Sequence, residues 1–210
     1  MRLHGNLRGI TKFMKNIFLS ASVPLITREY FDTANPFLIQ FAVREFLTAC
    51  LGRFRVVWGG HPAITPMVWA VCEDLGVEYA QSVTLYQSIL FKEFFPEENK
   101  RFGNVNYVDS VDNDMSKSLS KMRHEMLSLD YEAAVFIGGM KGIFDEYDLF
   151  KKFHPNVKVL PVYSPGGAAM QLAIDLKQPI DRIDYANMFY EFLGIEGTEP
   201  RHIKQPTNGI

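Results

Sequence analysis

Apolar residues in this chain form short runs that alternate with longer segments of helical spacing. The short runs are typical of buried strands and cover 16–21, 55–58, 82–88, 104–108, 134–137 and 157–162. Between them, apolar positions recur every three or four residues and predict helices over 36–50, 65–75, 115–126, 143–150 and 182–193, with a short one ending at 176. Thr65 is the expected N-cap of the second of these helices, and the charged and aromatic segment 91–102 is expected to be a helix or a lid. This alternation predicts an α/β fold, namely a Rossmann-like, doubly wound and mostly parallel sheet in a single domain.

The predicted domain covers 16–195, and the segments at the two ends of the chain differ from it. Residues 1–15 are expected to be a flexible extension and residues 196–210 a flexible polar tail. The run 17–26 after Lys15 imitates a short signal peptide, but Pro24 and Arg28 interrupt it. We interpret this run as the first buried strand.

Composition and charge exclude several classes of function. The 210 residues carry a formal net charge of −2, which gives no general attraction to nucleic acid or to an anionic membrane. The two cysteines, Cys50 and Cys72, lie in separate apolar segments and predict a reduced, cytoplasmic compartment. The acidic residues do not cluster with histidines at ligand spacing, so neither a metal site nor a cofactor is expected.

Glycine-rich turns follow several of the predicted strands. The most prominent follows 134–137 and opens a helix with acidic residues in its first turns. Glycine lets a ligand approach the main chain, and a helix N-terminus favours an anion. Ligands of open α/β sheets bind at the carboxyl ends of the strands, so we expect these turns to form one phosphate-binding edge. Its predicted members are Ser20, Ala21, Ser22, Gly59, Gly60, His61, Gly138, Gly139, Met140, Lys141, Gly142, Ser164, Gly166 and Gly167.

Three features of this predicted edge have an alternative interpretation. The small hydroxyl residues after the first strand, Ser20 and Ser22, also suit an ordinary polar loop. His61 can contact a phosphate or act as an acid or base, or it can be a simple loop residue. Arg123 lies at the edge of the apolar stripe of its helix. There it either pairs with an anion or extends along the apolar surface to reach water.

The glycine turns resemble those of the SLOG superfamily, which includes the Lonely Guy (LOG) phosphoribohydrolases, DprA-like proteins and sensor domains of bacterial immune systems. The LOG pattern has R-K-x-x-M on a helix and P-G-G-x-G-T-x-x-E after the next strand. The segments 123–126 and 138–146 are similar to these, and Arg123 and Glu146 have the separation of the LOG arginine and glutamate. The chain departs from the LOG pattern at Ile137, Ile143 and His61, and its overall pattern is closer to SLOG groups near defence genes.

The resemblance implies two functions that the sequence leaves open. The first is a sensor module in bacterial defence or signalling, which binds a nucleotide-derived ligand such as an ADP-ribose-type or cyclic nucleotide signal. The second is a LOG-like hydrolase, in which Arg123 and Glu146 cleave the N-glycosidic bond of a nucleoside 5′-monophosphate. A scaffold with a degenerate pocket is a third, blander interpretation. The resemblance also implies a homo-oligomer, a dimer or larger. The aromatic face near Phe189 is expected to be either part of the core or the contact between subunits.

Overall fold

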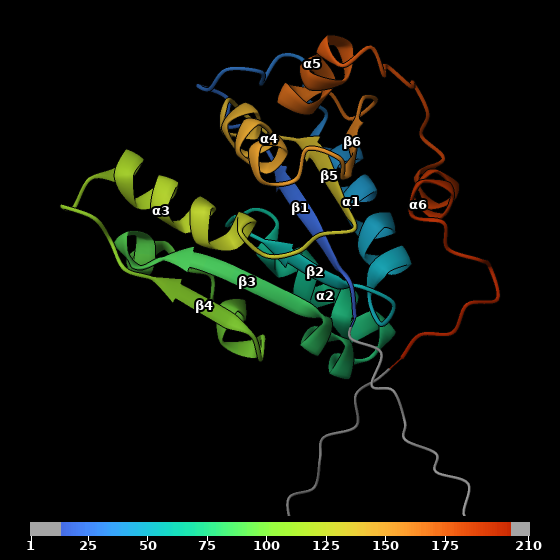
Figure 1. The fold of residues 1–210 in the computed structure, drawn as a ribbon, viewed down its shortest axis with the longest axis horizontal. Coiled ribbons are helices and arrows are strands. Elements are labelled where there is room, and N and C mark those ends of the chain that lie inside the picture. Colours follow the sequence, from blue (N-terminus) through green and yellow to red (C-terminus); the bar gives the residue numbers. More distant parts are fainter. Residues whose placement is uncertain (1–13, 203–210) are drawn as a thin grey trace, which may run out of the picture.

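The computed structural model describes residues 14–202 and consists of one sheet between two layers of helices (Figure 1). Most of the predicted N-terminal extension, and the tail from residue 203, lie outside the described residues. The strands are β1 (Asn16–Ser22), β2 (Arg55–Trp58), β3 (Val83–Ser88), β4 (Val105–Val108), β5 (Ala133–Gly138) and β6 (Lys158–Val162). The helices are α1 (Pro36–Cys50), α2 (Thr65–Leu75), α3 (Met115–Leu127), α4 (Gly142–Phe153), α5 (Gly167–Asp175) and α6 (Tyr185–Leu193).

All pairs of neighbouring strands in the six-stranded sheet are parallel, in the order β4-β3-β2-β1-β5-β6. The chain builds outward from β1 to β4, and then returns to place β5 on the other side of β1. The order of the strands therefore reverses between β1 and β5, which is where ligands bind in folds of this kind. The predicted α/β, Rossmann-like, single-domain fold is confirmed.

Helices cover both faces of the sheet. Successive side chains of a strand point to opposite sides, so a strand that is apolar throughout needs a core on each face. Ile17 and Leu19 of β1 belong to the apolar core formed with α1, α2 and α6. Phe18 belongs to the core on the other face, formed with α3, α4 and α5, where it stacks on Phe150 at 5.8 Å between ring centroids. The central strands are thus apolar on both faces, as the short continuous runs in the sequence predict.

Three local predictions differ from the structure. Thr65 was expected to cap α2, but Ile64 is the N-cap, because the carbonyl of His61 accepts hydrogen bonds from the N–H groups of Ile64 and Thr65. The segment expected as a helix or lid over 91–102 consists of two short 3₁₀ helices, η2 (Ile89–Phe94) and η3 (Glu97–Arg101), which flank Pro96. A further 3₁₀ helix, η1 (Val77–Ser82), replaces the predicted start of the third strand.

The aromatic face of α6 and the beginning of the polar tail both pack within the chain. Phe189 is fully buried and packs edge-on against Phe46 at 5.4 Å, so the core interpretation of this face holds and it is not available to a subunit. Beyond α6, the Arg201 guanidinium donates to the Leu51 carbonyl at 2.6 Å. The N–H of His202 donates to the Gly52 carbonyl at 2.6 Å. The described start of the predicted tail is therefore hydrogen-bonded to the end of α1.

Candidate functional site

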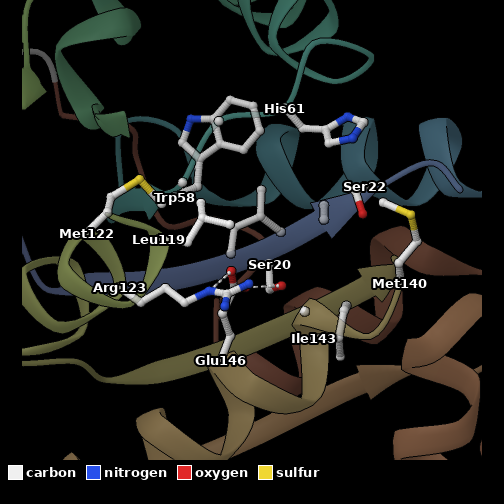
Figure 2. Close-up of a pocket in the computed structure, with 15 residues that line it drawn as sticks. Ser20, Ser22, Trp58, His61, Leu119, Met122, Arg123, Met140, Ile143 and Glu146 are labelled. Atoms are coloured by element: carbon white, nitrogen blue, oxygen red, sulfur yellow. Dashed lines mark hydrogen bonds and ion pairs between the residues drawn. The ribbon is translucent and has the colours of Figure 1, made fainter. Parts of the chain in front are cut away.

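A cavity of about 270 Å³ lies at the carboxyl ends of β1 and β2, between α3 and the start of α4 (Figure 2). This position is beside the point where the order of the strands reverses. β1 contributes its last residues, β2 contributes Trp58 and the glycine turn after it, and α3 and α4 contribute side chains that face each other. The lining residues are Leu19, Ser20, Ala21, Ser22, Trp58, Gly59, Gly60, His61, Leu119, Met122, Arg123, Met140, Gly142, Ile143 and Glu146.

The polar part of the cavity is a connected group of side chains from three elements. Arg123 of α3 donates from Nε to Glu146 Oε1 of α4 at 3.1 Å, and Ser20 of β1 donates from Oγ to Glu146 Oε2 at 2.5 Å. Arg123 also donates from Nη1 to Asp145 at 3.2 Å. The side chains of Arg123 and Glu146 are each 16% exposed, whereas that of Asp145 is 59% exposed. Arg123 therefore pairs with an anion inside the protein. The alternative, in which its side chain extends along the apolar surface to reach water, is excluded.

Gly142 allows the arginine to lie across the first turn of α4. A β-carbon at this position would be 2.7 Å from Arg123 Nη2, closer than such atoms approach one another. The absence of a side chain thus lets the guanidinium pack on the backbone and reach both carboxylates of the helix. A cation held at the N-terminal turn of a helix is opposed by the helix dipole, which the two acidic residues offset.

The second polar wall is the turn Gly59–Gly60–His61 after β2. Gly60 has a φ of +66°, and a β-carbon there would be 1.8 Å from the amide nitrogen of Gln87, so only glycine fits. The Nδ1 atom of His61 accepts from the N–H of Ala63 at 3.2 Å. Burial lowers the pKa of His61 from its ordinary value of 6.5. The imidazole is therefore neutral near pH 7, with its proton on Nε2, and can act as a hydrogen-bond donor.

The structure brings ten of the predicted site residues together and leaves six outside the cavity. Those that line it are Ser20, Ala21, Ser22, Gly59, Gly60, His61, Arg123, Met140, Gly142 and Glu146. Those that do not are Gly138, Gly139, Lys141, Ser164, Gly166 and Gly167. The first strand, the turn after β2 and the α3–α4 pair thus converge as expected. The turn after β6 lies apart from them.

The glycines outside the cavity serve close packing of the backbone. The N–H of Gly139 donates to the Ser22 carbonyl at 2.8 Å, and the Gly139 carbonyl accepts from the N–H of Ala168 at 3.0 Å. A β-carbon on Gly166, which has a φ of +75°, would lie 1.7 Å from the carbonyl oxygen of Thr33. These turns hold β1, β5 and α5 together at the carboxyl ends of the strands.

Two polar residues of the predicted site also have other surroundings. Ser164 is hydrogen-bonded to the Arg182 carbonyl and to the hydroxyl of Tyr185, so it anchors the segment before α6. Lys141 is the N-cap residue of α4, and it is exposed. Neither side chain faces the cavity that the other predicted residues form.

Sequence reasoning missed the apolar wall of the cavity. It consists of Leu19, Trp58, Leu119, Met122 and Ile143. Leu119 and Met122 belong to the same stripe as the buried Met126, so helical periodicity alone could not separate a pocket residue from a core residue. The position of Trp58 directly before the glycine pair was the one available signal.

Two features are absent from the part of the chain that the structure describes, namely a cluster of metal-type ligands and a membrane-spanning helix. Within residues 14–202, no three histidine, cysteine, aspartate or glutamate side chains gather as a metal site would require. None of the helices there has both the length and the apolar character needed to cross a bilayer.

Comparison with known proteins places the chain in a family. The model of the SLOG cluster3 family matches residues 29–193, which include α1, the Gly59–Gly60 turn of the cavity, and the Arg123–Glu146 pair. No curated protein and no solved structure matches the chain. The matched residues cover well over half of the sequence and include every described strand and helix after β1. The chain belongs to the SLOG cluster3 family.

Proposed function

We propose that this protein binds a nucleotide-derived ligand in the cavity between β1, β2, α3 and α4, and that it acts as a sensor module in bacterial defence or signalling. The observation that carries the proposal is the hydrogen-bonded group Ser20–Glu146–Arg123 at the cavity wall. Such a group is held in one geometry before the ligand arrives, which lowers the entropy lost on binding. Membership of the SLOG family supports a nucleotide-related ligand.

The polar groups of the cavity match the parts of a nucleotide. The carboxylate of Glu146 has acceptor capacity beyond the two bonds that it already makes, and it can bind ribose hydroxyls. The guanidinium of Arg123 suits a phosphate, because its planar fork can donate two parallel hydrogen bonds. His61 adds a neutral donor from the opposite turn. The ligand's binding would shift the protein between conformational or oligomeric states if its affinity for them differs.

The retained contact between Arg123 and Glu146 favours a second candidate function. In LOG enzymes this pair cleaves the N-glycosidic bond of a nucleoside 5′-monophosphate. Here Glu146 would activate water or hold the ribose hydroxyls, and Arg123 would stabilise the charge that develops on the sugar and phosphate. The binding role is preferred, because the chain departs from the LOG pattern at Ile137, Ile143 and His61. In addition, Gly139 packs against Ser22 and Ala168 and does not line the cavity.

A thermal-shift panel followed by chromatography separates the two functions. The panel contains nucleoside 5′-monophosphates, ADP-ribose and cyclic ADP-ribose isomers. A ligand that binds only the folded state stabilises it by about 2.7 kcal/mol at a hundred times its Kd, which raises the melting temperature by about 5–11 °C. Recovery of the intact ligand supports a sensor, whereas release of free base supports the hydrolase. If no compound shifts the melting temperature, the nucleotide proposal is wrong.

Glu146→Gln refines this test, with Asp148→Asn as its matched control. Both residues lie on α4, but Asp148 is exposed and does not line the cavity. In a hydrolase, Glu146→Gln abolishes base release; in a sensor, it leaves most of the ligand affinity, because the amide still accepts and donates hydrogen bonds. Asp148→Asn should change neither quantity.

A further inference from the structure

A second cavity, of about 280 Å³, adjoins the first and is lined by residues from η2. The two cavities have a common wall, which consists of Gly59, Gly60, His61, Leu119 and Met122. The second cavity extends from this wall toward the end of β3 and the segment between β3 and β4. Its remaining lining residues are Pro62, Gln87, Ser88, Phe91, Phe94, Phe95 and Pro96.

The chain after β3 places aromatic rings at this cavity instead of in the core. Ser88 caps η2 by accepting a hydrogen bond from the N–H of Leu90 at 3.4 Å. No residue of η2 is buried, and Phe94 is 72% exposed. Phe95 is fixed from outside by a stacked contact with Tyr107 of β4, with 5.7 Å between ring centroids. The segment thus presents phenylalanines that packing of the core does not require.

The chemistry of the second cavity differs from that of the first. Its lining includes no aspartate, glutamate, lysine or arginine. Its polar side chains are the imidazole of His61 on the common wall, the hydroxyl of Ser88, and the amide of Gln87, a residue that is 8% exposed. Within residues 14–202, this amide makes no hydrogen bond. The amide atoms themselves are not fully buried, so they are open to the cavity and can bond to the polar edge of a ligand there.

We propose that the second cavity binds the planar base of the nucleotide whose ribose and phosphate occupy the first; this inference rests on the proposed function. A neutral wall of phenylalanine rings with one amide suits a nucleobase, which stacks through its faces and hydrogen-bonds through its edge. It suits a phosphate less well, because its lining has no lysine or arginine to pair with the negative charge. Gln87 would then read the edge of the base, and Phe91 would stack on it.

The sizes of the cavities agree with this division. Small-molecule sites usually have volumes of about 300–1,000 Å³. The two cavities, of about 270 Å³ and about 280 Å³, each fall just below that range. A ligand of nucleotide size therefore needs both cavities. The bond between its sugar and its base would then lie beside the common wall, at His61, Leu119 and Met122.

The test compares ligands with and without a base. Isothermal titration of the full chain measures Kd for ribose 5-phosphate, for the adenosine, guanosine, cytidine and uridine 5′-monophosphates, and for ADP-ribose. At least one base-containing ligand should bind tenfold or more tightly than ribose 5-phosphate. Phe91→Ala and Gln87→Leu should each weaken that ligand about tenfold, and leave ribose 5-phosphate within twofold.

A matched control and the unliganded melting temperatures show whether a variant is simply misfolded. Phe37→Ala is the control, because Phe37 is 73% exposed on α1, which covers the other face of the sheet. Three results overturn the inference: equal affinity of the wild type for ribose 5-phosphate and every nucleotide, equal weakening of both kinds of ligand by the variants, or no weakening by either variant. Failure of every compound to bind overturns the proposed function itself, which is a distinguishable outcome.

Discussion

Replacement of Arg123 by alanine tests whether the polar group in the cavity is a preorganised unit. The substitution removes the Nε–Glu146 hydrogen bond of 3.1 Å and the contact with Asp145 of 3.2 Å. Glu146, whose side chain is 16% exposed, keeps Ser20 as its partner but loses its counter-charge. Hydrogen bonds to charged groups contribute about 1.5–3 kcal/mol. The Asp145 contact adds little, because that carboxylate is 59% exposed.

We therefore expect Arg123→Ala to lower the free energy of unfolding by about 1.5–3 kcal/mol. At about 2–4 °C per kcal/mol for a chain of this size, the melting temperature should fall by about 3–12 °C. Circular dichroism measures the melting curve, and urea titration measures the free energy. Arg123→Lys should recover only part of the loss, since one ammonium cannot reproduce the fork that reaches both Glu146 and Asp145.

A double-mutant cycle assigns the loss to the pair. Arg123→Ala and Glu146→Gln should together cost less than the sum of the two single changes, with a coupling energy of about 1 kcal/mol or more. A melting temperature of Arg123→Ala within 1 °C of the wild type would refute the reasoning, because it would mean that Glu146 finds equivalent solvation without the arginine. If the two single changes add exactly in the double mutant, Arg123 and Glu146 do not stabilise each other, and the loss comes from other contacts of Arg123.

Three further predictions follow from other groups. Gly142→Ala should weaken nucleotide binding, because its β-carbon would displace Arg123 Nη2, while the melting temperature changes little; Gly103→Ala, in open space, is the control. The pKa of His61 is lower in the folded protein than in the unfolded chain, so on acidification the imidazole of the unfolded chain takes up its proton at a higher pH. The free energy of unfolding should therefore fall as the pH drops below about 6.5. His61→Gln should remove that part of the slope in urea titrations; an unchanged slope contradicts the assignment. Burial raises the pKa of Cys72 to about 12 and that of Cys50 further, so a thiol reagent should label neither cysteine before the protein unfolds.

The fold was predictable because local signals and global topology agree. Apolar runs with no polar interruption, such as Val56 and Val57, require burial on both faces, and only a parallel sheet with helices on both sides provides it. Pro36 and Gly52 mark the limits of α1 as their backbone preferences predict. The element between β3 and β4 was less predictable. Its aromatic residues have neither a period of two nor one of 3.6, so no pattern distinguishes a 3₁₀ segment beside a cavity from a lid.

The glycine turns show what a sequence pattern cannot specify about a site. Both Gly59–Gly60 and Gly138–Gly139 follow a buried strand, and the sequence assigns them the same role. The difference arises from their neighbours in space. Gly139 is next to β1 and α5, whose backbone groups at Ser22 and Ala168 take up its N–H and its carbonyl. Gly59 and Gly60 face the side chains of Met122 and Gln87 instead, and these leave a cavity between them.

The same comparison explains why the spacing of Arg123 and Glu146 was a better guide than any glycine. Two charged side chains on α3 and α4 meet only if both helices lie on one face of the sheet with a fixed offset, which the separation in the sequence constrains. A glycine constrains only its own backbone. The contact at 3.1 Å thus carries information about the site that the glycine turns lack. In this chain, the spacing of two charged residues on facing helices therefore predicts which side chains line the cavity more specifically than a glycine turn does.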